Sequence, residues 1–412
     1  MASSGQAWDV VIVGGGPAGL STALSLSRHP VTILVLEQQP YPVSKPCGEG
    51  IMPTGLAHLK TLGVLPFLQA RPHRPFSGIT YHSAGSHQAS ANFQEGPGWG
   101  MERTVLSEGL REAVQSQANI TLHQAQVHVE VQGESVKVRV GSESLRPKLV
   151  IGADGLNSRI RKAAGLSGTK SRLQRWGVRQ HFQVAPWTDQ VEVYWAWGAE
   201  AYVTPVGPDR VGVAILWDRH RKPPEQAGKL LFLDRLALFP KLQERLQSAT
   251  PTDVPRAVGP LHRRTSGVIR PGLALIGDAS GYLDAITGEG LSLAFEQAVV
   301  LGEIVGPALR KDAPERFWAL QRYASSHAAI TRPYHQVTHL ALMLRNFPAL
   351  TDRIVRMFSQ NPQHFQHFLS ANMGLVPCWR LPPRAWAEML AGLFKNPPLN
   401  ALKTTRKQPE LS

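Results

Sequence analysis

Residues 8–37 read WDVVIVGGGPAGLSTALSLSRHPVTILVLE and contain a strand pattern, a glycine-rich turn and a helix pattern in succession. The apolar run at 10–13 is bounded by glycines, as expected of a strand that is buried on both faces. A helix pattern then places apolar residues at Leu20, Ala23, Leu24 and Leu26, and a second apolar run ends at Glu37. This order predicts a strand–helix–strand unit of the kind that binds a dinucleotide.

The three glycines of the turn have different expected roles. Gly14 permits the tight turn, Gly16 lets the backbone approach a pyrophosphate, and Gly19 lets the helix pack closely on the strand. The pyrophosphate then lies at the positive end of the helix, beside the first-turn residue Ala18. Glu37 follows Gly19 by eighteen residues and can accept hydrogen bonds from an adenosine ribose. The unit predicts an FAD or NAD(P) site without distinguishing between them.

Two later stretches repeat the combination of an apolar strand and glycine-rich turn. After the run LVI, the segment GADGLNSRIRKAAG at 152–165 contains Asp154 and Gly155. The segment at 272–298 begins with an apolar strand that ends just before Asp278. Together with the first unit, these stretches predict an α/β fold with more than one chain segment around the ligand.

The tetrapeptide TGEG at 287–290 opens an amphipathic helix, and it contains Gly288 and Gly290. The first turn of a helix has free N–H groups and the positive end of the helix dipole. Such a helix start can stabilise negative charge that develops on a group in front of it.

In order and spacing, these motifs resemble the three signatures of the flavoprotein monooxygenase superfamily, which has the para-hydroxybenzoate hydroxylase fold. The resemblance covers roughly the first 300 residues and implies FAD as the cofactor. It implies that Asp278 binds a ribityl hydroxyl and that the TGEG helix faces the flavin pyrimidine ring. It also implies that Asp154 and Gly155 lie where the FAD pyrophosphate and a pyridine nucleotide approach. One departure is Ala285, where most relatives have proline, and the turn is expected to be less rigid here.

The same resemblance assigns two further FAD contacts. Arg103 precedes the helix pattern VLSEGLREAV, as does the arginine that contacts the cofactor chain in relatives. Val127 begins a strand pattern whose backbone holds adenine in relatives. Because no second GxGxxG unit follows, NAD(P)H, the implied electron donor, is expected to bind transiently near the flavin. No metal site is predicted.

The segment SKPCGEGIMP at 44–53 contains Cys47 and Gly48, and it resembles the PCG loop of the geranylgeranyl reductase branch. In that branch the cysteine lies beside the flavin ring, so Cys47 is the candidate catalytic residue. Its thiol could pack on the flavin, tune its potential, position substrate, or act as a low-pKa thiolate near Lys45. The structural alternative is that Gly48 and Gly50 let the loop cross the flavin and Cys47 merely fits.

GEGIMP also resembles the GEATIP-like stretch of flavin-dependent halogenases. That branch needs a lysine about thirty residues further on, and no lysine occurs between Lys60 and Lys137. The segment Trp195-Ala-Trp197 continues with GAE and lacks the Ile-Pro of the halogenase motif. Both differences count against halogenation.

The region 170–265 alternates between apolar and polar residues, as antiparallel sheet does. In this fold such a sheet covers the flavin and lines the substrate pocket, for which we select Gln180, His181, Trp195 and Tyr202 as candidates. We therefore predict a split Rossmann-type FAD-binding domain, an inserted antiparallel β-sheet substrate domain and a helical C-terminal region. Their expected ranges are 1–71, 100–169 and 266–310 for FAD, 72–99 and 170–265 for substrate, and 311–412 for the helices.

Charge and cysteine content predict the surroundings of the protein. Only two cysteines occur, and the N-terminus lacks a secretory pattern, so we expect a cytoplasmic protein that could be peripheral to a membrane. From Arg310 onward there are fourteen Lys or Arg against five Asp or Glu. This basic region could contact an anionic membrane or an acidic carrier protein, or be a solvated face. Without a zinc-finger, RRM or basic-zipper pattern, we expect no nucleic-acid binding.

The leading functional prediction is NAD(P)H-dependent hydroxylation, or related oxidation, of an apolar phenolic or polyketide-like small molecule. The alternative is hydride transfer from flavin to an isoprenoid double bond, as the PCG loop suggests. A third hypothesis is a non-catalytic binder, because Rab escort-type proteins are similar at the N-terminal motif yet do not use the flavin. The presence of Asp278 and TGEG counts against that hypothesis.

Overall fold

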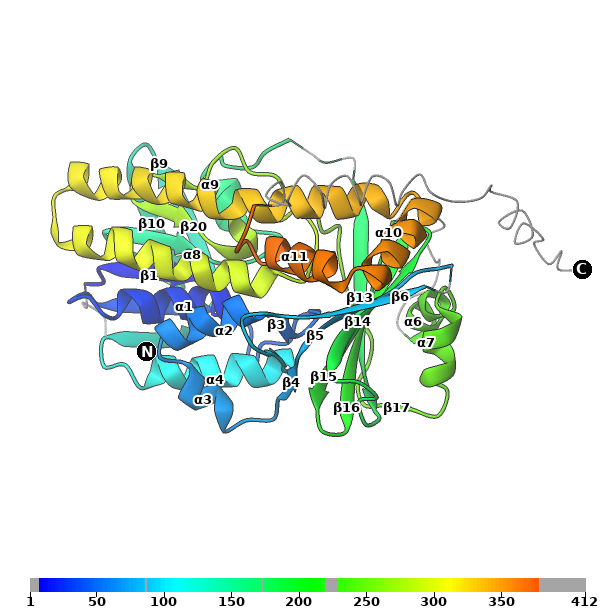
Figure 1. The fold of residues 1–412 in the computed structure, drawn as a ribbon. Helices are drawn as coiled ribbons and strands as arrows, with labels where there is room; N and C mark the ends of the chain where they lie inside the picture. Colours follow the sequence, from blue (N-terminus) through cyan, green and yellow to red (C-terminus); the bar gives the residue numbers. More distant parts are fainter. Residues whose placement is uncertain (1–6, 86, 170, 172, 219–228, 378–412) are drawn as a thin grey trace, which may run out of the picture.

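The computed structural model describes residues 7–85, 87–169, 171, 173–218 and 229–377. One half of the molecule is built on a six-stranded sheet (Figure 1). All neighbouring strands in this sheet are parallel except for one edge pair, β19 and β20. In spatial order the strands are β19 (Ile269–Arg270), β20 (Leu273–Leu275), β12 (Leu149–Gly152), β1 (Val10–Val13), β2 (Ile33–Glu37) and β8 (Ile120–Gln124). The strands are short apolar runs because both faces of the sheet are covered.

One face of this sheet carries helices. They are α1 (Pro17–Leu26), α4 (Arg103–Gln115) and α8 (Gly290–Val305), with α2 (Pro53–Thr61) and α3 (Leu65–Gln69) outside them. Residues Gly290–Arg310 are long and apolar enough to cross a membrane, but α8 packs between α1 and α9 in the core. The opposite face is covered by a three-stranded sheet of β9 (Val127–Gln132), β10 (Ser135–Val140) and β11 (Glu143–Leu145).

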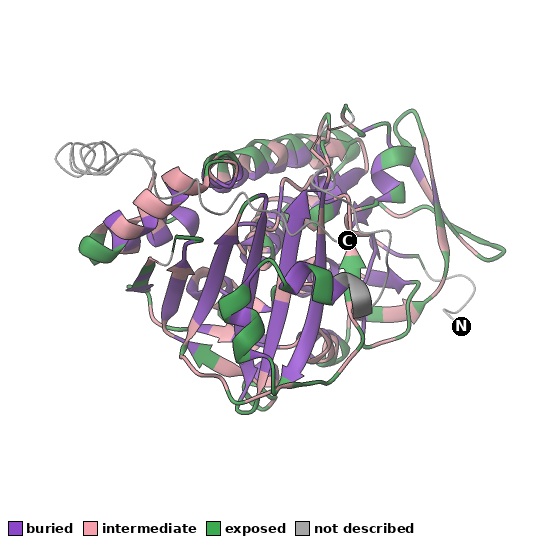
Figure 2. Ribbon diagram, turned by 90° about the vertical axis from the view of Figure 1, so that its right-hand side faces the viewer, coloured by how far each residue is buried: buried purple, intermediate pink, exposed green. Residues whose placement is uncertain are grey.

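A second large sheet contains eight strands and is antiparallel except where β14 pairs with β5. Its order is β17 (Thr250–Pro251), β13 (Arg175–Gln183), β16 (Arg210–Asp218), β15 (Ala199–Gly207), β14 (Gln190–Ala196), β5 (Gly78–His82) and β6 (Gln88–Asn92), and β18 (Arg256–Val258) pairs with β13. Figure 2 shows that these strands are largely buried. One face packs on α6 (Lys229–Leu236) and α7 (Pro240–Arg245), and the other faces the parallel sheet domain. A small sheet lies between the large sheet and the helices of the parallel sheet domain. Its strands are β3 (Gly50–Ile51), β7 (Gly98–Gly100) and β4 (Arg74–Phe76).

Three helices follow: α9 (Ala313–Leu344), α10 (Pro348–Gln360) and α11 (Pro362–Asn372). The first part of α9 packs in the core of the parallel sheet through Leu320 and Tyr323. Its last part packs with the large sheet through Ala341 and Leu342, so α9 runs along both halves of the molecule (Figure 1). Pro333 lies inside this helix.

The predicted fold class is confirmed: a Rossmann-type parallel sheet, an inserted antiparallel sheet and a helical C-terminal region. The part of the predicted C-terminal region at 378–412 lies outside the described residues. The domain limits stay a prediction.

Candidate functional site

The three glycine-rich motifs meet at one edge of the parallel sheet. They follow β1, β12 and β20, which are neighbours, and the carboxyl ends of parallel strands lie at the same edge. A cavity of about 420 Å³ opens there and continues to the large sheet. Predicted FAD-binding residues that line it are Gly16, Ala18, Cys47, Gly48, Arg103, Asp154, Gly155, Asp278, Gly288 and Gly290. Gly14, Gly19, Glu37 and Val127 lie outside this lining.

The geometry separates the glycines of the first motif into two groups. A Cβ on Gly14, which has φ +112°, would lie 2.3 Å from the carbonyl oxygen of Ala153, and one on Gly19 would lie 1.9 Å from that of Gly14. A side chain at either position would therefore clash with the backbone, so the fold itself requires glycine at both. A Cβ on Gly16 would be 3.9 Å from its nearest neighbour, Nη2 of Arg103. Gly16 keeps space open at the N-terminus of α1, where an anion binds favourably.

The buried carboxylate of Glu37, at the end of β2, is held by backbone amides. Its Oε2 accepts a hydrogen bond from Gly15 N at 2.7 Å, and its Oε1 accepts one from Gln39 N at 2.8 Å. Each carboxylate oxygen has a further lone pair for a ribose hydroxyl. Val127 begins β9 and pairs with Val140, so its place is the three-stranded sheet behind the parallel one.

Within the described part of the chain, two buried polar atoms in the cavity wall beside the FAD motifs form no hydrogen bond. Arg103 begins α4 and its Nε has none. Asp154 Oδ2 accepts hydrogen bonds from Arg159 N at 2.7 Å and Ile160 N at 3.2 Å, but its Oδ1 has none. Buried polar groups are rarely left unpaired, and a bound molecule with both acceptors and hydroxyl donors would satisfy these two. FAD, with a pyrophosphate and a ribityl chain, fits this arrangement.

Arg161 joins the second motif to the third, a role that the sequence did not reveal. This buried residue of α5 (Arg159–Ala163) donates from Nη1 to the carbonyl oxygens of Asp278 at 3.2 Å and Ala279 at 2.9 Å. Its Nη2 donates to the carbonyl oxygen of Leu156 at 2.9 Å. These contacts of Arg161 with the backbone fix the loop that carries Asp278. Burial raises the pKa of Asp278, and the positive charges of Lys45, Arg103 and Arg161 oppose that rise.

Cys47 lines the cavity between the parallel sheet domain and the large sheet. Its Sγ accepts a hydrogen bond from Glu49 N at 3.3 Å, and the carbonyl oxygen of Gly48 accepts one from Thr204 Oγ1 at 2.7 Å. Burial raises the pKa of the Cys47 thiol, although the charge of Arg103 opposes this. The shift argues against the thiolate role and is compatible with packing, tuning or positioning by a neutral thiol.

Replacing Cys47 by alanine tests these roles. We expect FAD content to stay unchanged, because the pyrophosphate and ribose contacts lie elsewhere. Single-turnover rates should fall by up to ~100-fold if the thiol positions a reacting group. Flavin occupancy, melting temperature and single-turnover rate should be measured on the same preparation. Unchanged rates at full occupancy, with a stability loss of ~1 kcal/mol, would reduce Cys47 to a space-filling residue.

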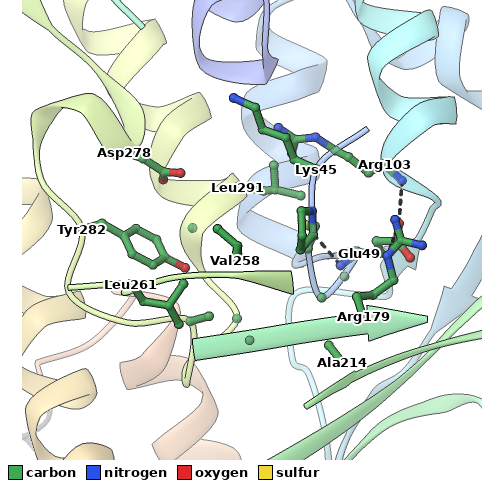
Figure 3. A pocket seen from close by; sticks show the side chains of 18 of the residues that line it. Lys45, Glu49, Arg103, Arg179, Ala214, Val258, Leu261, Asp278, Tyr282 and Leu291 are labelled. Carbon is green, nitrogen blue, oxygen red and sulfur yellow. Dashed lines mark hydrogen bonds and ion pairs between the residues drawn. The ribbon is translucent and has the colours of Figure 1, made fainter. Parts of the chain in front are cut away.

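Glu49, to which no sequence motif assigns a role, is the centre of a buried ionic cluster. It has φ +61°, and its Oε1 accepts a hydrogen bond from Arg103 N at 2.9 Å. Its Oε2 lies 2.6 Å from Nε2 of His181 and its Oε1 lies 3.8 Å from Nε of Arg179. Asp253 completes the cluster through an ion pair with Arg179 and a 2.9 Å contact with Nδ1 of His181. In Figure 3, Arg103, Glu49 and Arg179 lie on the opposite side of the cavity from Asp278 and Tyr282.

The cluster perturbs the titration of two of its members. Burial of the ring opposes the protonated form, but hydrogen bonds to Asp253 and Glu49 outweigh it and raise the pKa of His181 to about 9. Burial likewise opposes ionisation of Asp253, yet its contacts with His181 and Arg179 lower that pKa to about 2. His181 is therefore a cation near neutral pH, bound between two carboxylates.

The raised pKa of His181 predicts a pH-dependent stability. A histidine whose pKa is higher in the folded than in the unfolded state stabilises the fold fully below about pH 6.5. The free energy of unfolding should then decline as pH rises from about 6.5 through about 9. Urea unfolding at several pH values measures this decline, and His181→Gln should make it shallower. An equal slope in both proteins would contradict the assignment.

The predicted substrate residues lie in different places. Tyr202 lines the cavity and donates to the carbonyl oxygen of Ile286 at 2.6 Å. Trp195 lies behind the lining residue Tyr81, with their ring centroids 5.8 Å apart. Gln180 and His181 are not lining residues, and the Gln180 amide donates to the carbonyl oxygen of Asp253 at 2.8 Å. On β13 the lining residues are Gly177, Val178 and Arg179.

Among the described residues, no group of three or more His, Cys, Asp or Glu side chains could hold a metal ion.

Comparison with known proteins identifies the family. The model of the FAD binding domain family matches residues 7–336, which is most of the chain. The 3-demethoxyubiquinol 3-hydroxylase of Escherichia coli (strain K12) is 28% identical over 329 residues, covering 73% of this chain and 80% of that protein. The digeranylgeranylglycerophospholipid reductase 2 of Methanopyrus kandleri is 27% identical over 324 residues, covering 74% and 78%. Among solved structures, a flavin-dependent brominase has a TM-score of 0.78 at 16% identity, covering 94% of this chain and 97% of that one, which shows the shared fold. With its three motifs around one cavity and a family match over most of its length, this chain belongs to the FAD binding domain family and is an FAD-dependent oxidoreductase.

Proposed function

We propose that the protein hydroxylates an apolar, ring-bearing small molecule with FAD as cofactor and NAD(P)H as electron donor. The observation that carries this proposal is the continuity of the cavity from the FAD motifs to an apolar wall on the large sheet. Residues of that wall include Ile79, Tyr81, Val191, Val193 and Leu216. An apolar pocket with few polar groups suits a ligand that binds mainly by burial of apolar surface.

The chain's own residues would bind, orient and shield the reacting groups. When bound, FAD supplies hydride transfer and, once reduced, the oxygen chemistry of hydroxylation. Gly16 and Arg103 would hold its pyrophosphate, and Asp278 would hold its ribityl chain. The helix start at Gly290 would stabilise negative charge on the flavin ring. Side chains of the large sheet would exclude water from the opposite side of the cavity.

A second candidate is reduction of an isoprenoid double bond. Two observations favour it: Cys47 of the PCG loop lines the cavity, and a relative with 27% identity is named a digeranylgeranylglycerophospholipid reductase. The relative with 28% identity is named a hydroxylase, so the two reactions share one structural framework.

The two reactions are separated by one experiment on the purified FAD-loaded protein. The flavin is reduced anaerobically with NADPH or NADH, and candidate phenols, quinols or isoprenoids are then added with and without oxygen. Hydroxylation predicts a hydroxylated product only when oxygen is present. Double-bond reduction predicts reoxidation of the flavin by the isoprenoid without oxygen. No product in either arm with any of these compounds, or no flavin reduction by either nucleotide, would contradict the proposal.

We also propose that the C-terminal helical region contacts an anionic membrane surface. Gly198 N, in the β14–β15 hairpin, lies 3.5 Å from the carbonyl oxygen of Arg345, which brings the hairpin to the end of α9. Large apolar side chains near this junction are exposed: Trp197 by 65%, Phe347 by 55%, Met343 by 52% and Leu340 by 40%. Apolar side chains beside a basic region are typical of a surface that lies on a bilayer.

Co-sedimentation with liposomes tests the membrane contact. Binding to anionic liposomes should exceed binding to neutral ones and decline with salt, because salt screens the charges. Phe347→Ser should weaken binding, whereas Trp318→Ser, at an exposed position near the start of α9, should not. Equal recovery in the supernatant with both kinds of liposome would contradict the contact.

A further inference from the structure

One strand of the large sheet contacts both loops that border the FAD end of the cavity. Alternation places Glu200, Tyr202 and Thr204 of β15 on the same face of the sheet. Thr204 holds the carbonyl oxygen of Gly48, and Tyr202 holds that of Ile286. The strand therefore connects the Cys47 loop with the loop that precedes α8.

Glu200 belongs to a buried group of three charged side chains. Arg175, the first residue of β13, forms an ion pair with Glu200, and its Nε lies 2.8 Å from Oδ2 of Asp284. The side chains of all three are fully buried. Two carboxylates and one guanidinium leave one negative charge in excess. Nη1 of Arg175 and Oε2 of Glu200 form no hydrogen bond with any described residue, so the group is held more by ionic attraction than by a complete hydrogen-bond network.

Asp284 connects this buried charged group to the loop that precedes α8. Its Oδ1 accepts a hydrogen bond from Ile286 N at 3.1 Å, and the Ile286 carbonyl oxygen accepts from Tyr202. Gly288 N donates to the carbonyl oxygen of Ala285 at 3.0 Å. Both Ala285 and Ile286 line the cavity, and α8 begins at Gly290. The turn at Ala285 thus has side-chain anchors on either side.

We propose that Arg175, Glu200, Asp284 and Tyr202 are positioning residues that fix the loop at 284–288 and so set the reduction potential of bound FAD. Two physical effects support this role. The loop determines where the positive end of α8 lies relative to the cavity, and that end stabilises charge on a reduced ring. The group with the excess negative charge includes Asp284, the first residue of the loop, and a poorly screened charge there opposes the arrival of electrons. The proposal concerns FAD alone and holds for either candidate reaction.

Neutralising Asp284 tests the proposal without the need for a substrate. Asp284→Asn keeps the shape but removes the excess negative charge, so the reduction potential should become more positive. A tenfold change in the reduction equilibrium corresponds to about 30 mV for a two-electron couple. The potential is measured by anaerobic titration against a reference dye, together with the visible spectrum and the melting temperature. The matched control is Asp218→Asn, which removes a buried carboxylate that lies 2.6 Å from Arg345 and is not a cavity residue.

Both substitutions should lower the melting temperature, but only Asp284→Asn should shift the potential by at least a tenfold change in the equilibrium. A second pair covers the case in which Asp284→Asn fails to fold. Tyr202→Phe removes the hydroxyl that holds Ile286, whereas Tyr194→Phe removes one that donates to Glu192 at 2.8 Å and lies away from the cavity. Tyr202→Phe should alter the flavin spectrum and potential, and Tyr194→Phe should leave both unchanged. Wild-type potentials in Asp284→Asn or Tyr202→Phe, or equal shifts in a variant and its control, would overturn the proposal.

Discussion

Replacing Gly16 by valine should give a folded, colourless protein. Gly16 lines the cavity at the N-terminus of α1, and a Cβ there would meet nothing closer than 3.9 Å. The fold can therefore accept the side chain, but the branched methyl groups would occupy the space that a pyrophosphate needs. Absorbance of the purified protein, flavin content after reconstitution and the melting temperature together measure this result.

The control for this variant is Gly19→Val, three residues along the same motif. Its Cβ would lie 1.9 Å from the carbonyl oxygen of Gly14, so the contact of α1 with β1 could not form. We expect poorly folded protein from Gly19→Val and folded apoprotein from Gly16→Val. A yellow Gly16→Val protein with a full complement of FAD would contradict the assignment of the pyrophosphate site. A wild-type protein that could not be reconstituted with FAD would contradict the whole interpretation of this cavity.

Replacing Glu49 by leucine should destabilise the protein by about 3–5 kcal/mol, because a buried ionic cluster loses its central carboxylate. Arg179 and the His181 cation would then share only Asp253, which is partly exposed. The leucine side chain has a similar size, so the loss would come mainly from uncompensated charge. Unfolding in urea at pH 7 measures the change in free energy.

A matched control is Glu102→Leu, which removes the partner of Arg210 in a 2.6 Å ion pair. That pair is partly exposed, with side-chain exposures of 37% for Arg210 and 20% for Glu102, so its loss should cost about 1 kcal/mol or less. Equal losses in the two variants would show that the Glu49 cluster has no special stabilising role. The Glu49 variant should also bind FAD more weakly, because Glu49 Oε1 accepts the backbone N–H of Arg103.

The FAD end of the cavity could be predicted because its motifs are local in sequence. Each one follows a strand directly, and Gly14, Gly16 and Gly19 lie within a single strand–helix unit. Parallel strand order then brings Asp154 and Asp278 to the same edge. Here short-range patterns and a general rule of α/β sheets were sufficient.

The facing side of the cavity could not be predicted in this way. Arg175 and Asp284 are 109 residues apart, and His181 and Glu49 are 132 residues apart, so no local pattern reveals these pairs. Alternation predicts that His181 lies on a particular face of the sheet but not what covers that face, so a substrate role is predicted where the structure has an ion pair with Glu49. One usable signal was present: the alternation in AEAYVT, at 199–204, places Glu200, Tyr202 and Thr204 together. Charged residues at buried positions of a strand indicate partners elsewhere in the chain.

The course of α9 restricts how the molecule can open. A helix of 32 residues is about 48 Å long, and this one is packed at its two ends against different halves of the protein. A helix packed in this way resists hinge motion of one half against the other, because bending the helix would break hydrogen bonds inside it. Its weakest point is Pro333, which lacks a backbone N–H and removes one of those bonds. Any separation of the two halves large enough to let cofactor or substrate enter or leave the cavity should therefore bend α9 at Pro333.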